Sequence, residues 1–141
     1  MERLQDDPIR AEDLVREVRG DGDGAVALFL GTVRNRNAGR RVLHLEYHAY
    51  PGMAEREMER IEHDAAKRYG ASRVAIVHRT GRLEVGEVSV AVAVASAHRA
   101  EAMEACRFVI DTLKKTVPIW KKEYYEGGAV WIEGAGDTPA R

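Results

Sequence analysis

The chain has 141 residues and a formal net charge of −1, with 45% hydrophobic and 32% charged residues. This length suits a single domain over residues 1–141, with flexible ends expected at residues 1–10 and 134–141. The near-neutral charge gives no support for bulk binding to nucleic acid or to a membrane, and no apolar run is long enough to span a bilayer. Residues 1–10 are too polar for a signal peptide, and the single cysteine suits a reducing compartment, so we expect a cytoplasmic protein.

The first part of the chain predicts a helix followed by two strands. Residues 11–19 have the apolar spacing of a short amphipathic helix, and residues 25–33 form a nearly continuous apolar run that is typical of a buried strand. Residues 42–50 alternate between apolar and polar, which predicts a half-exposed strand. The inner face of this strand is predicted to carry Leu43, Leu45 and Tyr47.

The middle of the chain predicts a second helix and two further strands. A helix is expected to follow Pro51-Gly52 and to run to about residue 69. Its inward stripe consists of Ala54, Met58, Ile61 and Ala65. Residues 73–80 predict a strand that turns at Gly81, and residues 88–95 predict another, with valines on one face and small residues on the other. The small face favours close packing of a helix or a sheet.

A long helix is predicted between Ser96 and Pro118. Ser96 can cap its N-terminus, whereas Pro118 must end it, because proline lacks an N–H and disfavours the helical conformation of the preceding residue. Its core stripe consists of Ala102, Cys106, Val109 and Leu113, which makes Cys106 an inert core thiol. A last short strand is expected at residues 129–133. The pattern indicates one α+β domain with a mainly antiparallel sheet.

Four lysines surround the helix break. Lys114 lies on the last helical turn and borders the core stripe, whereas Lys115 follows Asp111 by four residues, the favoured spacing for a helical ion pair. In the extended segment that follows, alternation places Lys121 and Glu123 on one side and Lys122 on the other. A bend of this kind can direct Lys114 and Lys121 into one cavity. The alternative is a solvated face, since cations are favoured near a helix C-terminus.

Two other groups of residues could hold an anion. His98 and Arg99 begin the long helix, where free backbone N–H groups favour an anionic ligand; pairing with Glu101 is the alternative. Gly31 allows close approach of the backbone at the end of the first long strand, and Arg34 beyond it offers a planar donor fork. The alternative for Arg34 is an ordinary surface position.

Several well-known sites are absent from the sequence. There is no phosphate-binding loop, no dinucleotide fingerprint and no Cys-x-x-Cys pair, and the histidines lack the helical pairing that is typical of zinc sites. We therefore expect no bound metal and no cofactor.

A set of short motifs nevertheless carries a family resemblance. In order, they are Gly24-Ala25-Val26, Phe29-x-Gly31-x-Val33-Arg34-x-x-Asn37-x-Gly39, Tyr50-x-x-Met53-Ala54, His78-Arg79-x-Gly81, Gly86-Glu87, Ala97-His98-Arg99, Asp111-x-Leu113-Lys114 and Pro118-Ile119-Trp120-Lys121-Lys122-Glu123. Together, from Gly24 to Trp131, they resemble the large, catalytic subunit of molybdopterin synthase. The fold that this resemblance implies is an α/β hammerhead, in agreement with the α+β pattern.

The resemblance implies a sulfur transfer in molybdenum cofactor biosynthesis. Members of the family convert cyclic pyranopterin monophosphate (precursor Z) to molybdopterin by inserting two sulfurs as a dithiolene. The sulfur arrives as a thiocarboxylate on the C-terminal Gly-Gly of a small ubiquitin-fold sulfur-carrier subunit. Two large subunits form a homodimer, and one small subunit at each end completes a heterotetramer.

The resemblance also implies roles for residues of this chain. Lys114 and Lys121 match the catalytic lysines. The substrate-binding positions are matched by Thr32, Val33, Arg34, His98, Arg99, Lys114, Lys121, Lys122 and Glu123, and the pocket-lining positions by Phe29 and Ile110. Some members also place an arginine just beyond the last strand, where this chain has Gly134 and Ala135, so Arg40 or Arg141 would have to replace that contact.

Two other classes of function remain open. A non-catalytic module that binds an anion or a nucleotide would use His98, Arg99 and Arg34 but would not need the pair Lys114 and Lys121. A scaffold for a ubiquitin-like partner would need a groove for the partner's tail but no pterin pocket.

Overall fold

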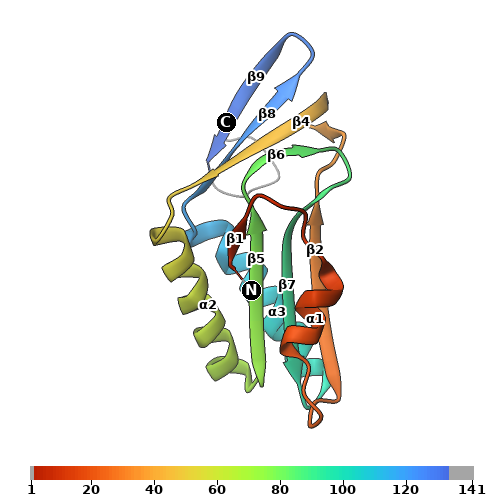
Figure 1. Ribbon diagram of the computed structural model, residues 1–141, viewed down its shortest axis with the longest axis vertical. Helices are drawn as coiled ribbons and strands as arrows, with labels where there is room; N and C mark the ends of the chain where they lie inside the picture. Colours follow the sequence, from red (N-terminus) through yellow and green to blue (C-terminus); the bar gives the residue numbers. More distant parts are fainter. Residues whose placement is uncertain (1, 134–141) are drawn as a thin grey trace.

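The computed structural model describes residues 2–133, arranged as a four-stranded sheet with the helices packed against it and a second, five-stranded sheet (Figure 1). The elements of the first half are β1 (Leu4–Gln5), α1 (Ala11–Val18), β2 (Ala25–Thr32), β3 (Arg36–Asn37), β4 (Arg40–Ala49) and α2 (Met53–Tyr69). Those of the second half are β5 (Arg73–Arg79), β6 (Gly81–Glu84), β7 (Val88–Ser96), α3 (Arg99–Thr116), β8 (Ile119–Tyr125) and β9 (Gly128–Glu133). The expectations for residues 134–141, including Gly134, Ala135 and Arg141, lie outside the described part of the chain.

The first sheet has the strand order β1-β5-β7-β2, with helices on both faces. Strands β5 and β2 both pair with β7 in antiparallel fashion, whereas β1 is parallel to β5. The valines of β7 (Val90, Val92 and Val94) face α2 and α3, and its alanines (Ala91, Ala93 and Ala95) face α1. The sequence predicted close packing of a helix or a sheet here, and the structure shows that a helix, α1, covers the small face.

The second sheet lies across one end of the first, at the top of Figure 1. Its strands have the order β3-β4-β8-β9, with β6 paired to β4, and every described pairing is antiparallel. Helix α3 ends beneath this sheet, and Val117 and Pro118 connect it directly to β8. The α+β class with mainly antiparallel sheets is therefore confirmed.

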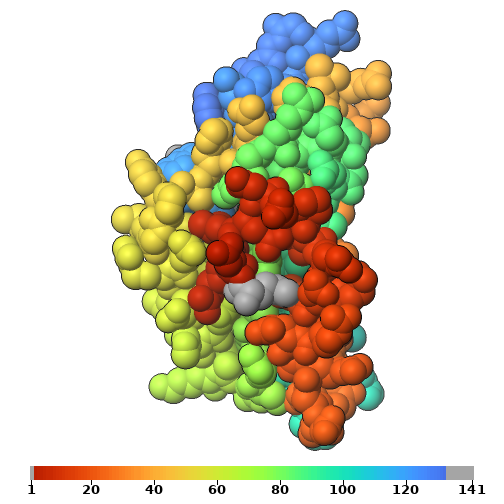
Figure 2. Space-filling view, in the orientation of Figure 1, coloured from red at the N-terminus to blue at the C-terminus, as the bar shows by residue number. Residues whose placement is uncertain are grey.

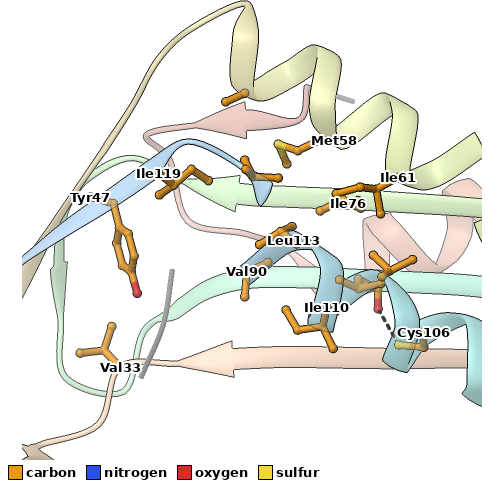
Figure 3. Packing of buried hydrophobic residues seen from close by; sticks show 14 of the residues in the cluster. Val33, Tyr47, Met58, Ile61, Ile76, Val90, Cys106, Ile110, Leu113 and Ile119 are labelled. Carbon is orange, nitrogen blue, oxygen red and sulfur yellow. Dashed lines mark hydrogen bonds between the residues drawn. The ribbon is translucent and has the colours of Figure 1, made fainter. Parts of the chain in front are cut away.

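The main core lies between the first sheet and the pair α2 and α3 (Figure 3). Both predicted helical stripes are buried as expected: Ala54, Met58, Ile61 and Ala65 in α2, and Ala102, Cys106, Val109 and Leu113 in α3. The Cys106 thiol lies 3.9 Å from the carbonyl oxygen of Val92, and burial raises its pKa to about 11. This thiol is a packed core group, as predicted.

The N-terminal residues, which we expected to be flexible, lie across the front of the first sheet (Figure 2). Strand β1 pairs with β5, and Arg3 donates to Glu62 at 2.7 Å. Within residues 2–133, no helix has the length and apolarity needed to cross a membrane.

Four local expectations are corrected. Strand β2 is not a buried strand but the edge of its sheet, with Leu28 and Leu30 about 40% exposed. A register shift between Val42 and His44 turns Leu43 outward, so its side chain is 45% exposed instead of facing the core.

Ser96 ends β7 and does not cap α3, whose N-cap residue is His98. The residues after the Gly81 turn form the short strand β6, which the sequence did not indicate.

Candidate active site

A pocket of about 250 Å³ opens where the two sheets meet the C-terminal end of α3. Its walls come from β2 and β7 of the first sheet, β4 and β8 of the second, and the last turns of α3. The lining residues are Phe29, Leu30, Gly31, Thr32, Val33, Arg34, Arg36, Asn37, Leu45, Tyr47, His78, Ser89, Val90, Ile110, Leu113, Lys114, Lys121 and Glu123. Figure 3 shows Tyr47, Val33 and Ile110 at the sheet junction where this pocket lies.

One wall of the pocket is the end of β2. Alternation along the strand turns Phe29 and Gly31 toward the pocket, while Leu28 and Leu30 are exposed. A Cβ atom at Gly31 would lie 2.7 Å from Cγ1 of Val90, so a larger residue at position 31 would force the Val90 side chain to move. The residues that follow, Thr32 to Arg34, form the rim next to the loop that carries Arg36.

Lys114 and Lys121 reach the pocket from different elements. Lys114 lies half-buried on the last turn of α3, and Lys121 lies in β8, where 6% of its side chain is exposed. The helix ends at Thr116, before Pro118, as the sequence predicted. Residues of β8 alternate between buried and half-buried, so Lys121 and Glu123 share the inner face and Lys122 lies on the other.

The carboxylate of Glu123 connects Lys121 on β8 to Asn37 on β3. The Nζ atom of Lys121 lies 3.4 Å from Oε2, and the amide of Asn37 donates to both carboxylate oxygens, at 2.9 and 3.0 Å. The hydroxyl of Tyr125 also donates to Glu123. Burial and the neighbouring carboxylate raise the pKa of Tyr125 to about 12. The buried charge of Glu123 is therefore satisfied from three directions.

A buried histidine forms part of the same wall. His78 is fully buried, and its Nδ1 lies 2.7 Å from the carbonyl oxygen of Arg79. Its ring packs edge-on against that of Tyr47, with centroids 4.9 Å apart. Loss of hydration, together with the charge of Lys121, lowers the pKa of His78 to about 4, so the imidazole is neutral. Its Nε2 has no hydrogen-bond partner among residues 2–133.

Two predicted substrate-binding residues lie far from this pocket. His98 and Arg99 are at the opposite end of α3, and fifteen residues of helix place Arg99 about 22 Å along the axis from Lys114. Both side chains are exposed, and Nδ1 of His98 lies 3.6 Å from the carboxylate of Glu101, the pairing that the sequence left open. One chain alone does not bring them to the lysine pair.

The other two lysines also lie outside the pocket. The ammonium of Lys122 lies over the rings of Tyr124 and Trp131, 5.2 and 5.3 Å from their centroids. Lys115 is exposed, but its predicted partner Asp111 instead pairs with Arg107, at 3.5 Å. The expected ion pair of Lys115 is therefore wrong, although the solvated position of this lysine is confirmed.

Sequence reasoning did not select Asn37, His78, Tyr47 or Arg36 as site residues. Asn37 belongs to a polar loop, and its role depends on Glu123, 86 residues further along the chain. His78 interrupts the apolar run of β5, which was the available signal for a buried polar role. Among residues 2–133, no group of three or more His, Cys, Asp or Glu side chains is arranged to hold a metal ion.

Comparisons with known proteins agree on one family. Residues 4–116 match the family model described as MoaE protein. The chain is 43% identical to the molybdopterin synthase catalytic subunit of Halalkalibacterium halodurans, over 92% of this chain and 83% of the relative. It is 44% identical to the protein of the same name from Pyrococcus abyssi, over 92% and 88%. The crystal structure of molybdopterin synthase from Staphylococcus aureus superposes with a TM-score of 0.88 at 36% identity, covering 92% and 94% of the two chains.

Proposed function

This chain belongs to the MoaE family, and on that basis we propose that it is the catalytic subunit of a molybdopterin synthase. It converts cyclic pyranopterin monophosphate to molybdopterin, with sulfur from the thiocarboxylated C-terminus of a small ubiquitin-fold subunit. The observation that carries this proposal is the convergence of Lys114 and Lys121, from a helix end and a strand, on one pocket.

The charges of the pocket suit these substrates. Among residues 2–133, four cationic side chains line it, Lys114, Lys121, Arg34 and Arg36, against the single carboxylate of Glu123. The phosphate of the pterin and the thiocarboxylate of the partner's tail are both anionic, so a locally cationic site in a near-neutral protein favours both. Arg34 at the rim offers the planar donor fork that suits a phosphate.

The two lysines can assist the transfer of sulfur from an acyl group. The thiocarboxylate sulfur would displace an oxygen group from a carbon of the pterin to give a thioester, and water would then attack the acyl carbon, which breaks the acyl C–S bond and leaves the sulfur on the pterin and a carboxylate on the partner's tail. Negative charge develops on the acyl oxygen in the second step, and a positioned ammonium stabilises or protonates it. The half-buried position of Lys114 and the buried position of Lys121 strengthen such electrostatic interactions relative to water. Because Glu123 is already bonded to Asn37, Tyr125 and Lys121, we assign it to the support of Lys121 and not to direct contact with the pterin.

The remaining binding residues require a second copy of the chain. His98 and Arg99 can act on the substrate bound near Lys114 only if they come from a neighbouring subunit, because their own chain holds them at the far end of α3. The exposed Leu28 and Leu30 on the edge strand β2 provide an apolar surface for such a homodimer. With one small subunit at each pocket, the complete enzyme is a heterotetramer.

Reconstitution tests the proposed function. The purified chain is incubated with cyclic pyranopterin monophosphate and the thiocarboxylated small subunit, and the dithiolene product is detected by mass spectrometry. The control is the same small subunit with an ordinary C-terminal carboxylate, which must give no product. Binding of the pterin without product supports an anion-binding module, and binding of the small subunit alone supports a scaffold; either result would overturn the proposal.

Two further assignments accompany this function. We place the protein in the cytoplasm, since its single cysteine excludes an intrachain disulfide framework and suits a reducing compartment, and fractionation of expressing cells tests this location. We also treat residues 1–141 as one domain, which requires a single cooperative unfolding transition in calorimetry.

A further inference from the structure

His78 is buried, and one of its two ring nitrogens lacks a hydrogen-bond partner among residues 2–133. Its Nδ1 is 2.7 Å from the carbonyl oxygen of Arg79, so this nitrogen carries the proton and donates it. Nε2 is therefore left with a lone pair, and it is the buried side-chain polar atom for which residues 2–133 provide no hydrogen-bond partner. Such orphaned atoms are rare in folded proteins and call for a specific explanation.

A side chain that can donate hydrogen bonds lies close to His78. Its ring packs edge-on against Tyr47, and Tyr47 lies directly opposite Lys121 in the ladder of β4 and β8. Directly opposite residues have Cβ atoms about 5 Å apart, so His78, Tyr47 and Lys121 are neighbours on one wall of the pocket. The charge of Lys121 acts on the imidazole and disfavours its protonation, which keeps Nε2 an acceptor.

A substrate atom is a poorer candidate for this acceptor. His78 has no exposed surface, so a ligand in the pocket could reach Nε2 only by displacing the residues that cover it. Lys121 is already part of that wall, and its flexible four-carbon stem carries three donors. Glu123 accepts one of them, at the long separation of 3.4 Å, which leaves Nζ room to move.

We propose that His78 is a positioning residue for Lys121, whose Nζ donates to Nε2 of His78 while a second donor of the ammonium meets the reacting group in the pocket. Glu123 and His78 then hold the lysine from two sides, one as a carboxylate and the other as a neutral acceptor. This inference rests on the proposed role of Lys121 in sulfur transfer. Without His78, Lys121 keeps its charge in the pocket but loses its alignment with the reacting group, so the rate of the chemical step falls while the affinity for the pterin is retained.

The test uses two substitutions that separate the two ring nitrogens. His78→Asn keeps an amide N–H near the position of Nδ1, so the bond to the carbonyl of Arg79 can persist, but it removes the acceptor at Nε2. His78→Gln extends a neutral amide to the position of Nε2 and can restore that acceptor. Each is made in the wild-type chain and in Lys121→Ala, and thermal unfolding confirms that the variants are folded.

Single-turnover dithiolene formation is measured in the complete complex, with pterin affinity measured separately. We expect His78→Asn to slow the reaction about tenfold to a hundredfold, the scale of a misplaced reacting group, with the pterin dissociation constant unchanged within about twofold. His78→Gln should recover most of the rate. In the Lys121→Ala background, neither substitution should slow the reaction further, because the group that His78 positions is absent.

The outcomes distinguish this inference from the proposed function. A wild-type complex that forms no dithiolene overturns the function itself. An active wild type and a slow Lys121→Ala, with His78→Asn at the wild-type rate, overturn only the positioning role. Equal slowing by His78→Asn in both backgrounds, or a weakened pterin affinity, would likewise show that His78 does not act through Lys121. If His78→Asn fails to fold, His78→Gln decides the matter: it must retain most of the wild-type rate.

Discussion

Lys121 and Glu123 form a buried ion pair across the inner face of β8, with Nζ 3.4 Å from Oε2 and side chains only 6% and 3% exposed. A buried charge without a partner is strongly unfavourable, so each of these residues requires the other. The pair is further supported by Asn37 and Tyr125, which donate to the same carboxylate. The cost of burying the lysine is thus offset by a network that reaches from the β3 loop to the end of β8.

Removal of one donor in this network should destabilise the protein. We expect Tyr125→Phe to lower the free energy of unfolding by about 1.5–3 kcal/mol, the range for a hydrogen bond to a charged group. The matched control is Tyr124→Phe, whose hydroxyl donates to the more exposed Glu46 and whose loss should cost about 1 kcal/mol or less. Urea denaturation measures both, and equal losses would contradict a special role for the buried carboxylate.

The four lysines should differ sharply in their effect on the reaction. Lys114→Ala and Lys121→Ala should each slow single-turnover dithiolene formation at least about 100-fold, the scale of one lost acid–base or oxyanion group. Lys115→Ala should be nearly silent, because this side chain is exposed and lies outside the pocket. Lys122→Ala should fall between, because the family resemblance implies a substrate-binding role for it although its ammonium lies over two aromatic rings outside the pocket. If Lys115→Ala slows the reaction as much as Lys114→Ala, the four lysines act through their combined positive charge, and the assignment of a specific catalytic pair is wrong.

The thiol should take no part in sulfur transfer. Cys106→Ser should keep most of the activity, because the thiol is buried in the α3 stripe. With its pKa raised to about 11 by burial, very little thiolate exists near neutral pH, so a thiol reagent should modify the native protein far more slowly than the unfolded chain. Near-complete loss of activity in a folded Cys106→Ser variant would contradict this expectation.

The neutral state of His78 makes stability depend on pH. Its pKa is about 4 in the folded protein and near 6.5 in an unfolded chain, so between these values the unfolded state binds more protons. The contribution of His78 to stability is therefore complete above about pH 6.5 and declines as the pH falls toward 4. At 1.36 kcal/mol for each pKa unit, the loss between about pH 6.5 and pH 5 should be about 2 kcal/mol.

Guanidinium denaturation at pH 7.5 and at pH 5 measures this decline. The matched control is His78→Gln, which cannot titrate and whose stability should change less than that of the wild type over the same interval. If the free energy of unfolding falls equally in both proteins between pH 7.5 and pH 5, burial does not keep His78 neutral.

Mixed dimers test whether the site is shared between subunits. If Arg99 serves the pocket of the neighbouring chain, a dimer of one Lys114→Ala subunit and one Arg99→Ala subunit contains one pocket with both defects and one intact pocket. Mixing and re-annealing the two impaired variants should therefore restore up to about a quarter of the wild-type rate, because half of the dimers are mixed and each has one intact site. If both residues serve the same chain's pocket, no mixture regains activity.

The sequence predicted the parts of the fold that depend on periodicity. The stripes of α2 and α3 and the alternation of β8 follow from single-residue spacing, and the structure confirms them. Leu43 could not be placed in this way, because an extra residue in one strand is visible only against its partner. The apolar run of β2 predicted a buried strand, but β2 lies at the edge of its sheet. An edge strand with an exposed apolar face has the same composition as a buried strand, so the sequence alone does not distinguish the two.

The candidate site was predictable where the chain brings its own residues together. Lys114 and Lys121 are seven residues apart around a proline, so their convergence follows from local geometry. Asn37 and His78 reach the same wall from distant strands, and the sequence held no sign of which loop or strand end would meet β8. The ion pair of Asp111 shows the opposite case: both Arg107 and Lys115 have suitable spacing, and only the side-chain conformation selects Arg107.

The short connection between α3 and β8 fixes which residues of β8 face the pocket. Only Val117 and Pro118 separate the helix from a strand whose faces alternate with a period of two. Insertion of a single residue there would exchange the two faces of β8, sending Lys121 and Glu123 outward and bringing Lys122 inward. Insertion of two residues would preserve the faces while displacing the strand by about 7 Å. The chain length between the two lysines is therefore as much a part of the site as the lysines themselves.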